Sequence, residues 1–393
     1  MRVAAALAER VRMMVILGRC TGCWNGTLRR EERVEPIMTE EAGGDGSAEF
    51  AERLIEVLNA GMLALMTSLG HRTGLFDAMA SLPPATSVQL AEASGLDERY
   101  VREWLGAMTT GGIVDHDPVA MTFVLPPERA AWLTRAAGPE NLALQAQYVG
   151  LLAQVEDQIV GCFRHGGGVP YSEFPKFQAI MAEDSGAVHD ATLVDITLPL
   201  VPGLVERLQR GIDVADVGCG SGHAIKLKAE AFPASRFVGF DISEAGLATG
   251  IAEAERKRLT NVRFEQQDAA RLEASEQFDF ITTFDAVHDQ ARPDLVLHGI
   301  AQSLRPDGVY LCVDIAASSA LADNLTHPLA PFLYTISCMH CMTVSLATGG
   351  MGLGTMWGER KARQMLADAG FTSVDLKHVE GDIANSYYIA TKA

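Results

Sequence analysis

Hydrophobic and polar positions follow a regular order in the second half of the chain. A β-type run over 212–215 precedes a glycine-rich turn, and helical spacing of apolar residues follows over 224–231. The next β-type run, 236–240, ends directly before the acidic residue Asp241. Strand, glycine turn, helix and acid-terminated strand in this order predict the nucleoside-binding half of a doubly wound α/β sheet.

The first half shows a different pattern. Apolar residues recur at helical spacing over 52–69, and a short helix is expected from a cap at Ser87 to Gly95. A longer helix over 98–110 is expected to begin after the cap Asp97. Two alternating runs, 113–116 and 121–125, then predict a small hairpin. Helix, turn, helix and hairpin together predict a winged helix-turn-helix.

A winged helix-turn-helix is open to two interpretations, a reader of DNA or a module for dimerisation and substrate capping. The helix that would enter a DNA groove carries two arginines against three acids, with aromatic and apolar residues suited to packing. Groove binding needs a basic surface, so we favour dimerisation and capping. The residues concerned are Asp97, Glu98, Arg99, Tyr100, Val101, Arg102, Glu103, Trp104 and Leu105.

The patterns divide the chain into four parts. We expect a flexible or targeting N-terminus over 1–50, the winged helix-turn-helix over 51–140, a helical linker and cap over 141–187, and the α/β domain over 188–393. Within the last part, the long segment 316–358 is rich in Met, Gly and Pro. An insertion of this kind at the carboxyl edge of a sheet predicts a lid.

Composition narrows the possible functions. The 393 residues carry a net charge of −18, from 32 basic and 50 acidic residues, so we expect no nucleic-acid partner. Seven cysteines in so long a chain fit a reducing compartment, and without a run of 18 apolar residues we expect no membrane span. The expected location is the cytoplasm. The arginine-rich residues 1–37 leave organelle import open, and translation from Met38 is the alternative.

The glycine turn reads Asp216-Val-Gly218-Cys-Gly220-Ser-Gly222, and its G-x-G-x-G spacing differs from the dinucleotide pattern G-x-G-x-x-G. Glycines let the backbone pass close to a ligand, and Asp241 can accept hydrogen bonds from both hydroxyls of a ribose. The turn resembles motif I of the class I S-adenosylmethionine-dependent methyltransferases.

Three further segments resemble the same family and follow in the family's order. They are Gln267-Asp268-Ala269, the run 278–285, and the run 304–311. The resemblance implies a doubly wound, seven-stranded α/β methyltransferase sheet behind an α-helical winged-helix domain, with S-adenosylmethionine as cofactor. The residues it assigns to the cofactor are Asp216, Gly218, Gly220, Gly222, Asp241, Ile242, Asp268, Ala269, Phe284 and Asp285.

His288-Asp289-Gln290 resembles the H-D-W motif of the dimeric small-molecule O-methyltransferases of the caffeic acid and hydroxyindole type, with Gln290 in place of Trp. The segment 177–181 resembles their F-N-x-A-M pattern in its Phe and Met only. The resemblance implies a homodimeric enzyme that methylates a small molecule at a hydroxyl oxygen. His288 and Asp289 would be catalytic, with His288 as the base, and Tyr171, Phe177 and Met181 would line the substrate pocket.

Other interpretations stay open at this stage. His288 could pack or orient its loop, and Asp285 could cap a helix. Cys338-Met-His340-Cys341 has metal-like spacing but lacks a further ligand, as does Cys20-Thr-Gly-Cys23, so we expect no metal. The protein could also methylate nitrogen, carbon or a protein, act as a transcription regulator that senses a ligand, or bind the cofactor without catalysis.

Overall fold

The structure is a computed structural model that describes residues 46–392. The expectations for the arginine-rich N-terminus and for Cys20 and Cys23 lie outside these residues. The described chain forms two units, 46–62 with Val379–Asp382, and Leu63–His378 with the residues from Ile383 onward. Helix α2 (Gly46–Thr73) begins in the first unit and ends in the second.

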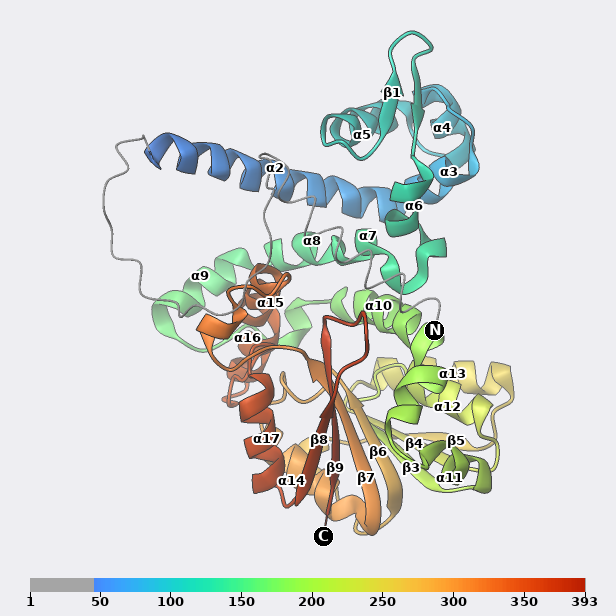
Figure 1. Cartoon of the computed structure of the whole chain (residues 1–393), viewed down its shortest axis with the longest axis vertical. Helices are drawn as coiled ribbons and strands as arrows, with labels where there is room; N and C mark the ends of the chain where they lie inside the picture. The colour runs from blue at the N-terminus through green and yellow to red at the C-terminus, as the bar shows by residue number, and fades with distance from the viewer. Residues whose placement is uncertain (1–45, 393) are drawn as a thin grey trace, which may run out of the picture. The chain divides into compact units, whose positions relative to one another are not determined.

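A seven-stranded sheet forms the centre of the C-terminal domain (Figure 1). Its order is β5-β4-β3-β6-β7-β9-β8; the first five strands in this order are parallel, and β9 pairs antiparallel with β7 and β8. The strands are β3 (Asp213–Val217), β4 (Arg236–Asp241), β5 (Val262–Gln266), β6 (Phe278–Phe284), β7 (Leu304–Ile315), β8 (Ser373–Lys377) and β9 (Asn385–Thr391). Chain order reverses between β3 and β6, and ligands of such sheets bind at the carboxyl ends beside this reversal.

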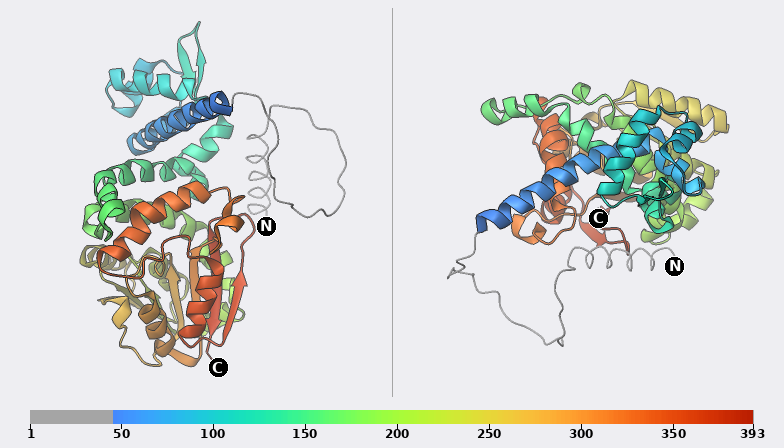
Figure 2. Two further views of the ribbon diagram at one scale, coloured as in Figure 1. Left: turned by 90° about the vertical axis from the view of Figure 1, so that its left-hand side faces the viewer. Right: turned by 90° about the horizontal axis from the view of Figure 1, so that it is seen from above.

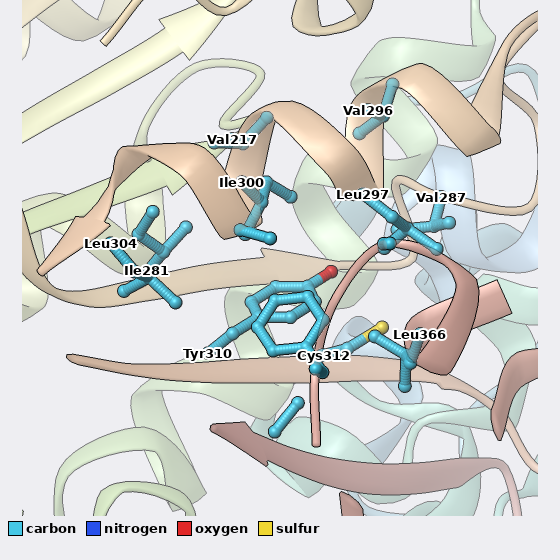
Figure 3. Packing of buried hydrophobic residues seen from close by; sticks show 14 of the residues in the cluster. Val217, Ile281, Val287, Val296, Leu297, Ile300, Leu304, Tyr310, Cys312 and Leu366 are labelled. Carbon is cyan, nitrogen blue, oxygen red and sulfur yellow. The ribbon is translucent and has the colours of Figure 1, made fainter. Parts of the chain in front are cut away.

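Helices pack against the sheet, and the buried side chains between helices and sheet form the hydrophobic core of this domain. Those of this domain are α11 (Leu204–Arg210), α12 (His223–Ala231), α13 (Glu244–Lys257), η5 (Ala269–Arg271), α14 (Pro293–Ser303) and α17 (Gly358–Asp368). Figure 3 shows the packing at one face, where Leu297 of α14 and Leu366 of α17 belong to one buried cluster with Ile281 and Tyr310 of the sheet. Burial of these side chains fixes the strands whose ends carry the site.

The winged helix-turn-helix is present as predicted. Its elements are α3 (Leu75–Ser81), α4 (Ser87–Ser94), α5 (Glu98–Thr110), β1 (Asp115–Asp117), β2 (Thr122–Val124) and α6 (Pro127–Leu133). Asp97 caps α5 by accepting bonds from the amides of Arg99 and Tyr100 at 2.9 and 3.4 Å. The expected cap Ser87 is instead the first residue of α4, because the preceding Thr86 forms a capping box with Gln89.

The linker region differs from the prediction in detail. The predicted helical linker is broken into short helices, and the helix that leads into the α/β domain begins at Phe177 and bends near Pro199. Pro199 lies at the start of a short 3-10 turn in this bend, where its missing amide is tolerated. The elements are η1 (Arg135–Glu140), α7 (Leu142–Gln145), α8 (Gln147–Ala153), α9 (Glu156–His165), η2 (Tyr171–Glu173), α10 (Phe177–Thr192), η3 (Leu193–Thr197) and η4 (Leu198–Leu200).

The segment 316–358, which we call the lid, is largely helical. It contains η6 (Leu321–Asn324), α15 (Ala330–Ile336), the π-turn η7 (Ser337–Cys341) and α16 (Met342–Ala347). Figure 2 shows these orange helices beside the green linker helices. The two are in close contact, since a Cβ on Gly168 would lie 1.9 Å from the carbonyl oxygen of Thr343. The Thr343 hydroxyl also accepts a bond from the amide of Val169 at 2.8 Å.

Two described helices are long and apolar enough to cross a membrane by length and composition alone, α2 and the lid helix Ala330–Ala347. The sequence pattern led us to expect none. The lid helix has 44% of its apolar window buried inside the fold, and α2 has 17%. Packing within the protein accounts for the apolar residues of the lid more fully than for those of α2.

Candidate active site

The glycine turn joins β3 to α12, and its three glycines have positive φ angles of 76°, 56° and 70° at Gly218, Gly220 and Gly222. A Cβ on Gly218 would lie 2.5 Å from Cβ of Ala286, and one on Gly222 would lie 2.2 Å from the Phe264 ring. At Gly220 nothing lies within 4 Å of that position. The turn is therefore packed at its ends and open at Gly220, as a close approach of backbone and ligand requires.

Asp241 lies at the end of β4, next to this open position. Its Oδ2 accepts a bond from the amide of Gly220 at 2.7 Å, and its Oδ1 accepts one from the amide of Ser243 at 2.8 Å. Each carboxylate oxygen keeps acceptor capacity for a ribose hydroxyl. The neighbouring Ile242 is 71% exposed and offers an apolar surface for an adenine ring. These residues fit the nucleoside half of the implied cofactor.

The adjacent strands supply the other predicted cofactor residues. Asp268 follows β5 and uses Oδ1 to cap η5 at the amide of Ala270, 2.9 Å away, which also fixes Ala269. Phe284 ends β6, with its ring centroid 5.4 Å from Nζ of Lys228. Contact of these residues with the cofactor stays a prediction.

Asp216 differs from the other predicted cofactor residues because it is buried beneath the turn. The Thr282 hydroxyl donates to its Oδ1 at 2.8 Å, and Nζ of Lys228 lies 3.5 Å from Oδ2. Lys228 is itself fully buried on α12. Both carboxylate oxygens thus have partners in the protein, and the structure gives Asp216 a role in holding α12 against β3 and β6. Its direct contact with the cofactor stays a prediction.

His288 follows β6 and is buried with its Nδ1 atom 2.8 Å from Oδ1 of Asp314. Asp314 lies near the end of β7, and its Oδ1 also accepts bonds from Nε1 of Trp357 at 3.0 Å and from the amide of Ile315 at 2.8 Å. The sequence analysis missed Asp314. The available signal was a single acid within the apolar run Leu311-Cys-Val-Asp-Ile315, because a buried charge requires a partner.

The environment of His288 shifts the pKa of its imidazole in two opposite directions. Burial lowers the pKa of the imidazole, whereas the Asp314 carboxylate and, after it, the Cys341 side chain raise it. The net pKa lies well above the ordinary histidine value. Burial raises the pKa of the neighbouring Asp289 to about 6, an increase that the positive charge of His288 opposes. His288 therefore carries a proton near neutral pH in this state of the protein.

Asp285 has a left-handed backbone conformation with φ of 49°. The helix-cap interpretation does not apply, because the next described helix, α14, begins only at Pro293. Ligand atoms of Asp285, His288 and Asp314 lie within 4.8 Å of one another, an arrangement that could hold a metal ion. Within residues 46–392, this group does not include Cys338, His340 or Cys341.

The predicted substrate residues meet on the linker side of the site. The Tyr171 and Phe177 ring centroids are 5.7 Å apart in an edge-on arrangement. The Tyr148 hydroxyl donates to Sδ of Met181 at 2.8 Å, which joins α8 to α10. His340 of the lid stacks on Phe177, with centroids 3.5 Å apart. The structure thus brings the three predicted residues together and adds His340 to them.

Comparison with known proteins identifies both parts of the chain. Residues 61–135 match the Rv2258c-like winged HTH domain, and residues 208–370 match a methyltransferase domain. The chain contains a winged helix-turn-helix domain followed by a methyltransferase domain. Two structures similar to this chain were solved with the cofactor or its product, human N-acetylserotonin methyltransferase in complex with SAM and PigF with SAH.

Curated relatives share part of the methyltransferase domain. Trans-aconitate 2-methyltransferase of Acidovorax sp. (strain JS42) is 31% identical over 128 residues, which cover 29% of this chain and 48% of the relative. Nocamycin O-methyltransferase of Saccharothrix syringae is 33% identical over 127 residues, which cover 31% and 45%. The chain thus spans less than half the length of these methyltransferases.

Solved structures share the whole fold. Mitomycin 7-O-methyltransferase MmcR has a TM-score of 0.65 at 17% identity, covering 88% of this chain and 100% of that one. Human N-acetylserotonin methyltransferase, solved in complex with S-adenosylmethionine, has a TM-score of 0.64 at 16% identity, covering 90% and 100%. At these identities the likeness concerns the fold.

Proposed function

We propose that the methyltransferase with its winged-helix module transfers the methyl group of S-adenosylmethionine to a hydroxyl oxygen of a small molecule. The observation that carries the proposal is the His288–Asp314 pair, in which His288 follows β6, the strand beside β3 and its glycine turn, and Asp314 lies in β7. When bound, the cofactor supplies an electrophilic methyl group on a sulfonium. A hydroxyl is a weak nucleophile until its proton is removed, and an imidazole held by a carboxylate can remove it.

The pair assigns separate tasks to the two imidazole nitrogens. The carboxylate of Asp314 accepts a hydrogen bond from Nδ1–H of His288, which leaves Nε2 as the atom that takes the proton. His288 is ready for this step only in its neutral form, so the step requires loss of the proton that Asp314 stabilises. The aromatic linker residues and the lid would exclude water from the reaction.

The charges of α5 support a small-molecule acceptor over a nucleic acid. Its two arginines each form an ion pair within the helix, Arg99 with Glu103 at 2.5 Å and Arg102 with Glu98 at 3.3 Å. Arginines that neighbour acids in this way offer little net charge to phosphates. We therefore propose a small-molecule acceptor and no nucleic-acid partner. We further propose that the protein has no membrane partner and forms a homodimer in the cytoplasm.

Methylation at nitrogen, carbon or a carboxylic acid is the competing proposal, and the relatives include a tRNA (guanine-N(7)-)-methyltransferase and trans-aconitate 2-methyltransferases. A direct experiment incubates the full chain with tritiated S-adenosylmethionine and a panel of phenols, aliphatic alcohols, amines and carboxylic acids. We expect label in the phenols or alcohols, and mass spectrometry with NMR should place the methyl group on oxygen. Label in amines, in carboxylic acids or on ring carbon alone would contradict hydroxyl methylation. Cofactor binding without any transfer would support an inactive scaffold.

A further inference from the structure

His189 lies near the C-terminal end of α10 and has no role in the function proposed so far. The residue is half-buried, and its Nδ1 atom is buried without a hydrogen-bond partner among the described residues. A buried polar atom without a partner is unfavourable, so each such atom in a native protein requires an explanation. A ligand that supplies the partner is the explanation that the surroundings of His189 favour.

The imidazole of His189 contacts the predicted cofactor site. Its ring centroid lies 4.6 Å from that of Phe284, in an edge-on arrangement with an interplanar angle of 66°. Phe284 ends β6, and β6 pairs with β3, the strand that leads into the glycine turn. His189 therefore lies at the carboxyl ends of the two strands between which chain order reverses, where ligands of such sheets bind.

The residue next to His189 joins α10 to the glycine turn. Oδ1 of Asp190 lies 2.8 Å from Nε2 of His223, the first residue of α12 after Gly222. One turn earlier in α10, a Cβ on Gly186 would lie 3.9 Å from the His223 ring. Helix α10 thus contacts the end of the glycine turn through Asp190 and the end of β6 through His189.

The charges around His189 favour an anion as its ligand. Burial and, after it, the charges of Lys228 and His223 lower the pKa of His189 to about 3, so its imidazole is neutral at pH 7. The one acid that acts on this pKa, Asp190, has the smallest effect and is paired with His223. A neutral imidazole can carry its single ring proton on Nδ1 and donate it to an oxygen of the ligand.

The order of the strands indicates which part of S-adenosylmethionine would reach His189. The predicted adenine and ribose positions, at Asp268 and Asp241, follow β5 and end β4. The next strands in the sheet are β3 and β6. The methionine part of the cofactor continues beyond the ribose and is therefore expected at the glycine turn and the end of β6, beside Phe284. Its carboxylate is the single anionic group of the cofactor.

We propose that His189 binds the cofactor by donating a hydrogen bond from Nδ1 to the carboxylate of its methionine part. The inference rests on the proposed function for the identity of the cofactor. It assigns a binding residue to α10, a helix that lies before the methyltransferase domain in the chain. His189 then distinguishes S-adenosylmethionine from adenosine compounds that lack this carboxylate.

Two probes that differ in one carboxylate test this inference. S-Adenosylmethionine and decarboxylated S-adenosylmethionine are each titrated into the full chain at pH 7, and calorimetry gives the two dissociation constants. We expect the wild type to bind S-adenosylmethionine at least about tenfold more tightly, because the decarboxylated compound leaves Nδ1 without a partner. His189→Phe should remove this preference by weakening S-adenosylmethionine binding while leaving binding of the decarboxylated compound unchanged.

A matched control and a second variant guard against misfolding. His298→Phe changes an exposed histidine on α14 and should keep the preference. His189→Asn keeps an N–H donor and should keep part of it. If His189→Phe is misfolded by circular dichroism, NMR of the wild type with nitrogen-15 histidine replaces it: S-adenosylmethionine should shift the Nδ1 resonance of His189, and the decarboxylated compound should not.

The outcomes separate this inference from the proposed function. Equal binding of the two probes by the wild type overturns the role of His189, even if methyl transfer to a hydroxyl compound is observed. An unchanged preference in folded His189→Phe, or equal weakening of both probes, overturns it as well. A preference that depends on His189, without methyl transfer to any hydroxyl compound, would support the binding role and contradict the proposed reaction. Binding of neither probe contradicts both.

Discussion

The Nδ1 atom of His288 lies 2.8 Å from Oδ1 of Asp314, and both side chains are buried. One carboxylate oxygen thus holds the imidazole, while Oδ2 of Asp314 has no partner among the described residues. The arrangement fixes the orientation of the ring and keeps its proton bound to a higher pH than burial alone would allow. Our first prediction follows from this second effect.

Asp314→Asn should move the pH dependence of turnover to lower pH. The proposed base acts when neutral, so the wild-type rate should rise with pH around a midpoint above the ordinary histidine value of about 6.5. Without the carboxylate, burial dominates and lowers the pKa of His288. The measurement is the turnover number between pH 5 and pH 9. Superimposable profiles for the two proteins would refute the assigned role of Asp314.

The same pair should link stability to pH. A histidine whose pKa is raised on folding stabilises the protein fully below its unfolded pKa, and this contribution is lost as pH rises through the folded value. The wild type should therefore lose melting temperature as the pH rises from about 6.5 through the folded pKa of His288, relative to Asp314→Asn.

His288→Ala should lower the turnover number by about 10²–10⁴-fold, the usual contribution of general-base assistance. Cofactor affinity should change little, because the predicted ribose and adenine positions lie at the ends of β4 and β5. Steady-state assays measure the turnover number, and calorimetry with S-adenosylmethionine measures the cofactor affinity, with His298→Ala as control. Near wild-type turnover with the wild-type pH profile would assign His288 to packing instead.

Asp241→Ala should weaken cofactor binding by about 1–3 kcal/mol, the cost of leaving hydrogen bonds to a charged group unmade. The amides of Gly220 and Ser243 would also lose their acceptor, so part of the effect would come from the turn. Calorimetry with S-adenosylmethionine gives the change in affinity, and Ser243→Ala controls for local disturbance. An unchanged dissociation constant would falsify the ribose assignment.

Chelation tests the group formed by Asp285, His288 and Asp314. We predict that the enzyme uses no metal, so dialysis against EDTA should leave turnover and cofactor affinity unchanged. The hydrogen bond between His288 and Asp314 already satisfies one potential ligand atom of each residue. Loss of activity on chelation, with recovery on addition of Mg²⁺, Mn²⁺ or Zn²⁺, would instead identify the group as a metal site.

Helix α2 provides the test of the proposed dimer. It exposes a series of large apolar residues, each at least 46% exposed: Phe50, Leu54, Ile55, Leu58 and Met62. A second copy of the chain would cover them, since exposed apolar area of this extent marks an interaction surface. Leu54→Glu with Leu58→Glu should convert a dimer into a monomer in light scattering, and Val119→Glu in the wing should not. A monomeric wild type at micromolar concentration contradicts the dimer, and vesicle binding would favour a membrane surface.

Much of the fold followed from local pattern. The glycine turn, the acid at Asp241 and the order of strands specified the sheet because each feature depends only on neighbours in the chain. The winged helix followed from caps such as Asp97 for the same reason. The bend after α10 follows from Pro199 and Pro202, which a helix interior does not tolerate, whereas the start of α10 at Phe177 depends on tertiary packing.

The site was less accessible to sequence reasoning. His288 and Asp314 are 26 positions apart and meet only because β6 and β7 are paired. For Asp216, the sequence motif predicted contact with the cofactor but did not predict its burial next to Lys228. That burial depends on the orientation of α12, which no local sequence pattern gives. His340 carried a metal-like spacing whose actual neighbours, the rings of the linker, come from 163 to 169 positions earlier in the chain.

The π-turn Ser337–Cys341 has a consequence for how this protein could diversify. Such a turn contains one residue more than a regular helical turn and is frequent at functional positions. Loss of a single codon there would restore regular helix and rotate one side of the lid by about 100° relative to the other, since a helix advances 3.6 residues per turn. A one-residue deletion could thereby replace the side chain that faces Phe177 without altering the sheet, so insertions and deletions in this turn offer descendants of the gene a short route to new acceptors.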